Sequence, residues 1–418
     1  MSTCAFFNLP GAIGHLNPTV PLVKNLVQRG ERVIYYAGEE AKAQITSAGA
    51  EFRSCQELLN YSHDDPKIAD NVILTAQALL SATEKGVGPL SVSLKNDHVD
   101  YVLYDGQCPW GKFIAAHLKV PGICLNSTII SSPYLMLGDT IMAKEIFKIL
   151  IRVGKLVPMI QRIKKLAQRE NFPYKGFWYH VFDLLANRGD LNIVFLPACM
   201  QPYHRLLGKS YRFVGASVPE LRSWAGPDIS YPAADRALIY ISLGTLHNAQ
   251  PGFYRTCLSM LENEPFDVIM SVGERINIEN LGSIPANCAV YSKVPQLDVL
   301  KHADLFISHG GSNSINESML HGVPMLIVPM QLEQAFNARQ LKRMNAALFI
   351  PMHRVTATHL RHSIYKILGS KRFAEAANVI GQQIKVAGGT VRAADEIIDL
   401  IEQQGIATNK HKLHSHIA

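Results

Sequence analysis

Short apolar segments alternate along this chain with segments of helical length, and the alternation occurs in two separate series. The first series has candidate strands at Ala5–Leu9, Val33–Ala37, Tyr101–Tyr104, Ile123–Asn126 and Ile193–Leu196. The second series has candidate strands at Ala237–Leu243, Val268–Val272, Ala289–Ser292, Leu305–Ser308 and Met325–Val328. Apolar strands connected by helices are typical of parallel sheets that are covered on both faces. We therefore expect an α/β fold with two doubly wound domains that face each other across a cleft.

A segment rich in proline and serine separates the two series. Residues 217–235 lack strand character and are predicted to form the linker. The first domain then covers residues 1–216 and the second covers residues 236–405, with residues 406–418 as a tail. Helical patterns at Thr356–Gly369, Arg372–Ala387 and Thr390–Gln404 follow the last strand of the second series. Ligands of such sheets bind where the strands end at their carboxyl side, so polar residues at those points are the candidates for a site.

The composition limits the class of protein. The chain of 418 residues is 48% hydrophobic and has 41 basic and 34 acidic side chains, without the alternation of basic and aromatic residues that nucleic-acid surfaces use. We therefore expect no nucleic-acid partner. The seven cysteines are scattered and include no Cys-x-x-Cys pair, which favours a reducing compartment over a disulfide framework or a structural zinc. The start has no signal-peptide pattern and no apolar run reaches about 18 residues, so a cytoplasmic protein is expected.

One strand of the second series ends in a glycine-rich turn. Leu305–Ser308 leads into His309-Gly310-Gly311-Ser312-Asn313-Ser314, and a helix-like segment follows at once. Glycines allow the backbone to approach an anion closely, and a helix N-terminus offers free N–H groups and about half a positive charge. Glu317 follows one helical turn later, where its carboxylate is suited to a sugar diol. This pattern indicates a nucleotide-sugar site.

These residues also carry a resemblance to a known family. The donor-binding signature of that family resembles a set of segments in this chain: Pro295-Gln296, His309-Gly310-Gly311, Asn313-Ser314, Glu317, Gly322-Val323-Pro324 and Glu333-Gln334. The family is that of the UDP-dependent glycosyltransferases with the GT-B fold, and its bacterial macrolide-type glucosyltransferases are the most similar members. The opening segment 8–40 resembles their first strand, loop and helix. Two motifs in the correct order are far more specific than either alone, and the resemblance is weakest between Gly138 and Asn187.

The resemblance implies a fold and a reaction. The fold is GT-B, with two Rossmann-like domains and a last helix that returns to the first domain. The reaction is an inverting, metal-independent transfer of a hexose, most simply glucose, from a UDP-sugar to a hydroxyl of a small hydrophobic acceptor such as a macrolide, phenol, sterol or carotenoid. No cofactor is expected besides the donor, and the chain has no Asp-x-Asp metal motif and no His-x-x-x-His zinc motif. Two alternatives stay open: a UDP-sugar epimerase on the same fold, and a non-catalytic nucleotide-binding helper protein.

The candidate catalytic residues are His15 and Asp105. His15 follows the first candidate strand in a loop with glycines at positions 11 and 14, and imidazole is well suited to take a hydroxyl proton near neutral pH. Asp105 ends another candidate strand, so its carboxylate is expected at the same sheet edge, where it would stabilise an imidazolium. In the resembling family the two positions are the general base and its paired aspartate. The alternatives are a histidine that caps a helix and a structural aspartate.

The candidate donor-binding residues all belong to the second series. Ser242, Gly244 and Thr245 follow its first strand and are expected to contact the β-phosphate, with a plain turn as the alternative. The resemblance implies contacts to the diphosphate from His309, Gly311, Asn313 and Ser314, and contacts to hexose hydroxyls from Glu333 and Gln334, which are otherwise a capped helix start. Lys293, before Pro295 and Gln296, occupies the position of a tryptophan that stacks on uracil in plant relatives, and Ser312 replaces a second plant tryptophan.

The acceptor region is less specific. Trp110 and Met136 are candidates for lining an apolar acceptor pocket, but at helical spacing such residues are more often part of a core. Segment 143–169 contains eight basic residues and one acid, interleaved with apolar residues. A basic amphipathic segment of this kind is predicted either to touch an anionic membrane surface or, as the favoured interpretation, to form a solvated helix face over the acceptor pocket.

Overall fold

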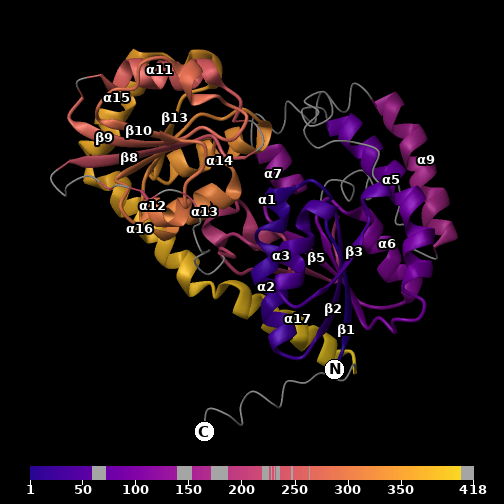
Figure 1. Ribbon diagram of the computed structural model, residues 1–418. Coiled ribbons are helices and arrows are strands. Elements are labelled where there is room, and N and C mark those ends of the chain that lie inside the picture. The colour runs from indigo at the N-terminus through magenta and orange to yellow at the C-terminus, as the bar shows by residue number, and fades with distance from the viewer. Residues whose placement is uncertain are drawn as a thin grey trace, which may run out of the picture. The chain divides into compact units, whose positions relative to one another are not determined.

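A computed structural model describes residues 1–58, 72–138, 153–170, 187–218, 226, 228–229, 231, 236–245, 248–262 and 264–405. The chain divides into two compact units (Figure 1). The first consists of Met1–Pro219 together with Ala387–Ala418, and the second of Glu220–Val386. Most of the predicted linker, all of the predicted tail and residues 143–152 lie outside the described residues. None of the helices described here combines the length and the apolar character that crossing a membrane requires.

In the described part of the first unit, seven parallel strands form one sheet in the order β3-β2-β1-β4-β5-β6-β7. Their bounds are β1 (Thr3–Phe7), β2 (Arg32–Ala37), β3 (Glu51–Ser54), β4 (Tyr101–Asp105), β5 (Gly122–Asn126), β6 (Leu191–Val194) and β7 (Tyr211–Phe213). The central strand β1 is in register with both neighbours, so that Cys4 lies opposite Val33 of β2 and Tyr101 of β4. Because these strands are parallel, β1 and β4 end at the same edge of the sheet.

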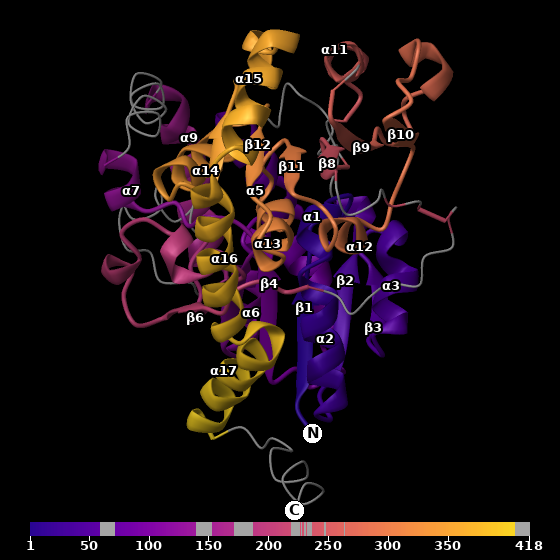
Figure 2. The ribbon, with the colours of Figure 1, turned by 90° about the vertical axis from the view of Figure 1, so that its left-hand side faces the viewer.

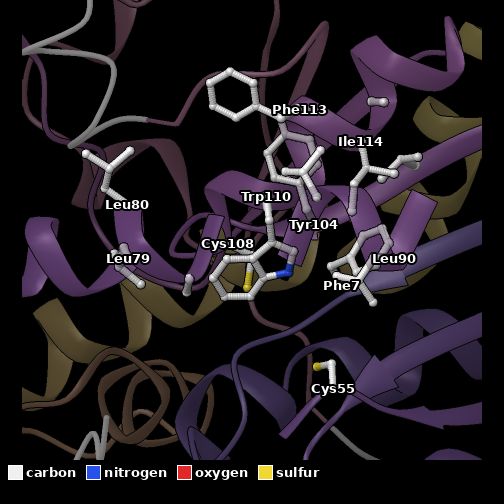
Figure 3. Packing of buried hydrophobic residues seen from close by; sticks show 14 of the residues in the cluster. Phe7, Cys55, Leu79, Leu80, Leu90, Tyr104, Cys108, Trp110, Phe113 and Ile114 are labelled. Carbon is white, nitrogen blue, oxygen red and sulfur yellow. The ribbon is translucent and has the colours of Figure 1, made fainter. Parts of the chain in front are cut away.

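Helices cover both faces of this sheet. They are α1 (Ile13–Leu16), α2 (Thr19–Gln28), α3 (Lys42–Ser47), α5 (Val72–Ser93), α6 (Pro109–Leu118), α7 (Pro133–Gly138), α9 (Val153–Arg169) and α17 (Gly389–Gln403), with short 3-10 turns at Glu39–Ala41, Gln56–Leu58, Ala198–Met200 and His204–Leu206. Alternate residues of β1 face opposite sides: Ala5 and Phe7 pack with α5, α6 and α9, and Cys4 and Phe6 pack with α2, α3 and α17. Figure 3 shows part of the first of these cores.

The last helix, α17, belongs to the first unit although the preceding helix belongs to the second. It lies beside α2 (Figure 1), and Ile397 and Ile401 are fully buried in the core that α2 also covers. Arg29 of α2 forms an ion pair with Asp395 at 2.6 Å, and the backbone N–H of Gly389 donates to the carbonyl of Val214 at 2.7 Å. Apolar burial and these specific contacts together hold α17 on this sheet.

The described part of the second unit is built around a six-stranded parallel sheet with the order β10-β9-β8-β11-β12-β13. Its strands are β8 (Ala237–Ser242), β9 (Phe266–Ser271), β10 (Cys288–Tyr291), β11 (Leu305–Ser308), β12 (Met325–Ile327) and β13 (Ala347–Phe349). The helices are α11 (Pro251–Leu261), α12 (Gln296–Leu300), α13 (Ser312–Leu320), α14 (Leu332–Arg343), α15 (Ala357–Leu368) and α16 (Lys371–Val386), with 3-10 turns at Ile278–Leu281 and Met352–Arg354. Figure 2 shows α16 lying against α13.

The predicted α/β fold with two parallel sheets is confirmed. All ten candidate strands are present with small shifts of their ends, whereas β3, β7 and β13 were missed. Each of these three lies at an edge of its sheet and is only partly buried, so its sequence lacks the continuous apolar character of the central strands. Asn17 has helical backbone angles, and α2 begins at Thr19, directly after Pro18.

Candidate functional site

His15 and Asp105 meet at the carboxyl edge of the first sheet. His15 lies in α1, which follows the loop after β1, and Asp105 is the last residue of the neighbouring strand β4. The distance from His15 Nδ1 to Asp105 Oδ2 is 2.9 Å, and the other carboxylate oxygen accepts from the backbone N–H of Gln107 at 2.8 Å. Because an ionised carboxylate only accepts, Nδ1 carries the proton and Nε2 is the basic ring nitrogen. Asp105 is 1% exposed, so the pair is strongly oriented.

A buried polar chain lies beneath α1 and was not predicted from the sequence. The Asn8 amide donates to the hydroxyl of Tyr35 at 2.7 Å and to the carbonyl of His15 at 3.4 Å. Tyr35 lies 2.6 Å from the hydroxyl of Thr19, which in turn donates to the carbonyl of Leu16 at 2.7 Å. Burial raises the pKa of Tyr35 and keeps the phenol protonated as a donor. These hydrogen bonds tie the C-terminal part of α1, at His15 and Leu16, to the sheet and so position the backbone of His15.

Two further residues that were not predicted lie next to the pair. Ser127, directly after β5, places its hydroxyl 3.3 Å from His15 Nδ1 and is 6% exposed. Asn187 has a positive φ of 39° and donates from its amide to the carbonyl of Asp105 at 3.4 Å. Ser127 could have been found from the sequence, because it directly follows the end of a candidate strand. The sequence around Asn187 contains no comparable signal.

In the second unit the predicted phosphate-binding loops follow neighbouring strands. Ser242 ends β8 and is in register with Ser308, which ends β11, so the loops at Gly244 and His309 emerge at the same edge. Gly244 has a φ of +77°, and a Cβ atom there would lie 2.5 Å from Cε1 of His309. A Cβ atom on Gly311 would lie 2.6 Å from Nε2 of the same ring. Two glycines therefore make the space that the imidazole occupies. Thr245 is exposed beside this turn.

The N-terminus of α13 presents the remaining candidates for phosphate contact. Gly311 is its extended N-cap residue, Asn313 is half-buried and Ser314 is 8% exposed. The Ser312 hydroxyl instead donates to Glu333 at 2.8 Å, and the Asn337 amide contacts the same carboxylate oxygen at 3.2 Å and the carbonyl of Gly310 at 3.0 Å. Ser312 and Asn337 thus connect the glycine turn to the start of α14, and Asn337 was not predicted.

Glu317, the residue predicted to bind a sugar diol, is held by a neighbouring side chain. The Gln296 amide, at the start of α12, donates to Glu317 of α13 at 2.6 Å, a short bond of the kind that a charged acceptor makes. Pro295 precedes this helix as its N-cap residue. Lys293 is exposed two residues earlier, so its side chain is accessible to solvent.

Gln334 caps the start of a helix, which was the alternative interpretation from the sequence. Its side chain accepts from the backbone N–H groups of Met330 and Gln331 at 2.9 and 3.1 Å and donates to the Gln331 side chain at 3.0 Å. This is a capping box at the start of α14, and Gln334 is only 3% exposed. Glu333 is half-buried, with one carboxylate oxygen committed to Ser312 and Asn337.

Of the two candidates for an acceptor pocket, the structure describes the side chain of Trp110 alone. Trp110 is 3% exposed and packs in the core of the first unit (Figure 3), so the structure supports the core interpretation. Met136 lies in α7, but its side chain is outside what the structure describes. In the basic segment, α9 buries Ile160 and Ile163 against the same core, and Arg162 donates to Glu84 of α5 at 2.9 Å. The described part of this segment therefore uses its apolar face for packing.

This chain is similar to glycosyltransferases of known sequence or structure. A family model described as "UDP-glucoronosyl and UDP-glucosyl transferase" matches residues 228–382. The protein described as "Uncharacterized UDP-glucosyltransferase YojK" of Bacillus subtilis (strain 168) is 31% identical, over 98% of this chain and 100% of the relative. The oleandomycin glycosyltransferase of Streptomyces antibioticus is 26% identical, over 94% and 89%. The crystal structure of the kitacinnamycin glycosyltransferase superposes with a TM-score of 0.82 at 26% identity, over 96% of this chain and 99% of the other.

Proposed function

This chain belongs to the UDP-glucoronosyl and UDP-glucosyl transferase family, and we propose that it transfers glucose from UDP-glucose to a hydroxyl of a small hydrophobic natural product, with inversion and without a metal ion. The observation that carries the proposal is the 2.9 Å contact between His15 and Asp105 at the sheet edge. It supplies the base that a transfer to a hydroxyl requires and that mere nucleotide binding does not.

The acceptor side of the reaction depends on His15. Its Nε2 takes the hydroxyl proton while the acceptor oxygen attacks the anomeric carbon. The new carbon–oxygen bond forms on the side opposite the breaking bond to the diphosphate, so the configuration inverts. Asp105 holds the ring in the tautomer that leaves Nε2 basic and stabilises the imidazolium that forms. The imidazolium then passes the proton to the departing UDP or to solvent water.

The leaving-group side depends on the second unit. As the glycosidic bond to UDP breaks, negative charge grows on the β-phosphate. His309, the backbone N–H groups at the start of α13 and Thr245 are preorganised donors for that charge. Within the described residues, no three His, Cys, Asp or Glu side chains gather as a metal-ligand set. The metal-independent reaction is a proposal that rests on these donors, and treatment with EDTA tests it directly.

Different observations support the proposed donor and the proposed acceptor. UDP-glucose as the donor is supported by the name of YojK, together with Glu317 and Glu333 as acceptors for ribose and hexose hydroxyls. A macrolide or another small hydrophobic alcohol as the acceptor is supported by the relative that is named for oleandomycin. Phenols, sterols and carotenoids belong to the same chemical class of lipophilic hydroxyl compounds.

The test is mass spectrometry of acceptors after incubation with UDP-glucose and EDTA. The panel contains macrolides, phenols, sterols and carotenols, and each product is examined by NMR for the β configuration. We expect one added hexose with the wild type and a loss of rate of about 10²- to 10⁴-fold for His15→Ala, because a general base is removed. The matched control is His204→Ala, at a half-buried histidine of the same unit whose Nδ1 lies 3.1 Å from the carbonyl oxygen of Gln201.

Other outcomes would contradict the proposal in different ways. A changed sugar nucleotide without any acceptor would indicate an epimerase. UDP binding without turnover of any acceptor or donor would indicate a nucleotide-binding helper protein. Full activity in His15→Ala would exclude His15 as the base, and loss of activity with EDTA that added metal restores would exclude the metal-independent reaction.

A further inference from the structure

A chain of two hydrogen bonds leads from the core of the second unit to Glu317. The hydroxyl of Tyr240, in the central strand β8, donates to Oε1 of Gln296 at 3.1 Å. Nε2 of the same Gln296 donates to Oε2 of Glu317 at 2.6 Å. Three elements that are distant in sequence, β8, α12 and α13, therefore meet in one polar connection.

The donors and acceptors in these two hydrogen bonds can be assigned in only one way. A carboxylate accepts only, so Gln296 must turn its NH₂ group toward Glu317 and its carbonyl oxygen toward Tyr240. Tyr240 must then be the donor. Burial and the nearby negative charge of Glu317 raise the pKa of Tyr240, so the phenol keeps its proton at neutral pH. The orientation of the Gln296 amide is thereby set by its two neighbours.

Tyr240 is a rigid anchor for this connection. It is 1% exposed, and its ring stacks on Phe306 of β11 with centroids 4.6 Å apart and an interplanar angle of 14°. A buried phenol that is packed in this way has little freedom to follow a moving partner. Gln296 and Glu317 are half-buried and would otherwise sample several rotamers.

From these observations we propose that Tyr240 is a positioning residue that makes the donor site prefer ribonucleotides over 2′-deoxyribonucleotides. The inference rests on the proposed function, because it takes Glu317 as the acceptor of ribose hydroxyls. A carboxylate held in one orientation binds a cis-diol through two hydroxyls, whereas a deoxyribose offers one. Fixing Glu317 therefore stabilises the ribonucleotide more than its deoxy analogue.

The experiment compares the affinities for UDP and 2′-deoxy-UDP by titration calorimetry, which needs no acceptor. The ratio of the two dissociation constants is measured for the wild type, Tyr240→Phe and Tyr254→Phe. The first variant removes the hydroxyl and keeps the stack on Phe306. Tyr254, a fully buried tyrosine of α11, controls for the loss of a buried phenol elsewhere in the same unit.

We expect the wild type to bind UDP on the order of ten-fold more tightly than 2′-deoxy-UDP, as one hydrogen bond to a charged group implies. In Tyr240→Phe the ratio should fall by about three- to ten-fold, mainly through weaker UDP binding. In Tyr254→Phe it should stay at the wild-type value. A merely structural role for Tyr240 would weaken both ligands alike and leave the ratio unchanged.

The result that overturns the inference is an unchanged ratio in Tyr240→Phe, or a wild type that binds both ligands equally. If thermal unfolding shows that Tyr240→Phe does not fold, Gln296→Met is used instead, because it interrupts the same hydrogen bonds nearer to the surface. An unchanged ratio of dissociation constants in Gln296→Met would also overturn the inference. Failure of the wild type to bind UDP or UDP-glucose at all would instead refute the proposed function itself.

Discussion

At the scale of single residues, the site depends on side chains whose partners are remote in sequence. His15 is oriented by Asp105 and lies 3.3 Å from Ser127, while its backbone carbonyl is held by Asn8. Each of these groups lies at the end of a strand of one parallel sheet or directly after it, which is why the short helix α1 can be fixed from several sides. In the second unit, the imidazole of His309 occupies space that two glycines, Gly244 and Gly311, leave open.

Gly244→Ala should weaken donor binding more than it weakens the fold. The added methyl group would lie 2.5 Å from His309, so the ring must leave its place between the two glycines. We expect the dissociation constant for UDP to rise by about ten-fold or more, the value of one charge-assisted hydrogen bond. Backbone strain at a positive φ adds about 1 kcal/mol of destabilisation. Calorimetry with UDP and thermal unfolding measure the two effects separately.

The matched control for this substitution is Gly282→Ala. Gly282 also has a positive φ, +95°, but a Cβ atom there meets nothing within 4 Å. It should therefore show the strain without the loss of UDP affinity. Equal loss of affinity in both variants would mean that general strain, rather than displacement of His309, is responsible.

At the scale of elements, the position of α13 is set by close packing on α16. Gly381 of α16 approaches α13 so closely that a Cβ atom there would lie 2.2 Å from the carbonyl oxygen of Met319. That oxygen is part of the backbone of α13, so the backbone of α13 or of α16 must shift if a side chain is introduced. Because the N-terminus of the same helix carries Gly311 and Asn313, a structural contact at its other end is coupled to the candidate phosphate site.

Gly381→Ala is accordingly expected to destabilise the protein, although alanine is the better helix former by about 1 kcal/mol. The steric overlap should cost about 1–3 kcal/mol, as overpacking does in other cores, and UDP affinity should fall as α13 shifts. Gly252→Ala in α11, where a Cβ atom meets nothing within 4 Å, should be neutral or stabilising. Denaturant unfolding and UDP titration of both variants test this, and a stabilised Gly381→Ala would contradict the packing argument.

Elements also show where prediction from sequence succeeds. The central strands and the three C-terminal helices were located from apolar periodicity, because burial on both faces or on one stripe is visible in the residues themselves. The edge strands β3, β7 and β13 were missed for the same reason, since their residues are only partly buried. Glu333 and Gln334 were predicted as a pair, yet the start of α14 uses Gln334 for its capping box.

At the scale of the whole molecule, the chain is organised as two units, and α17 completes the first of them. Its buried face includes Ala393, Ile397 and Ile401, which share a core with β1 and α2. The candidate donor-binding residues, in contrast, all belong to the second unit. Stability of the first unit and nucleotide binding by the second should therefore respond to different substitutions.

Ile397→Asp is expected to destabilise the first unit by about 3 kcal/mol or more, because a charge would be placed in an apolar core without a partner. Ile397 is fully buried, whereas Val391 of the same helix is 54% exposed, so Val391→Asp is the matched control. Thermal unfolding should show the loss for Ile397→Asp alone. At a temperature where the protein is folded, both variants should retain their affinity for UDP. A large loss of UDP affinity in Ile397→Asp would show that the two units are energetically coupled.

The amino-acid sequence by itself determined the α/β class, the two parallel sheets and the places where strands end in polar or glycine-rich loops. These features are local, because apolar periodicity and turn chemistry are carried by neighbouring residues. The tertiary structure decided which of those residues meet. The sequence placed His15 and Asp105 at one sheet edge, and the resemblance implied the return of the last helix, but the 2.9 Å contact of the pair and the residues that pack α17 on the first sheet were decided by the fold. The burial of Trp110 and the hydrogen bonds from Tyr240 to Glu317 likewise depend on segments that are far apart in sequence. Such partners are selected by packing, since burial and hydrogen-bond geometry depend on the whole fold rather than on any one segment.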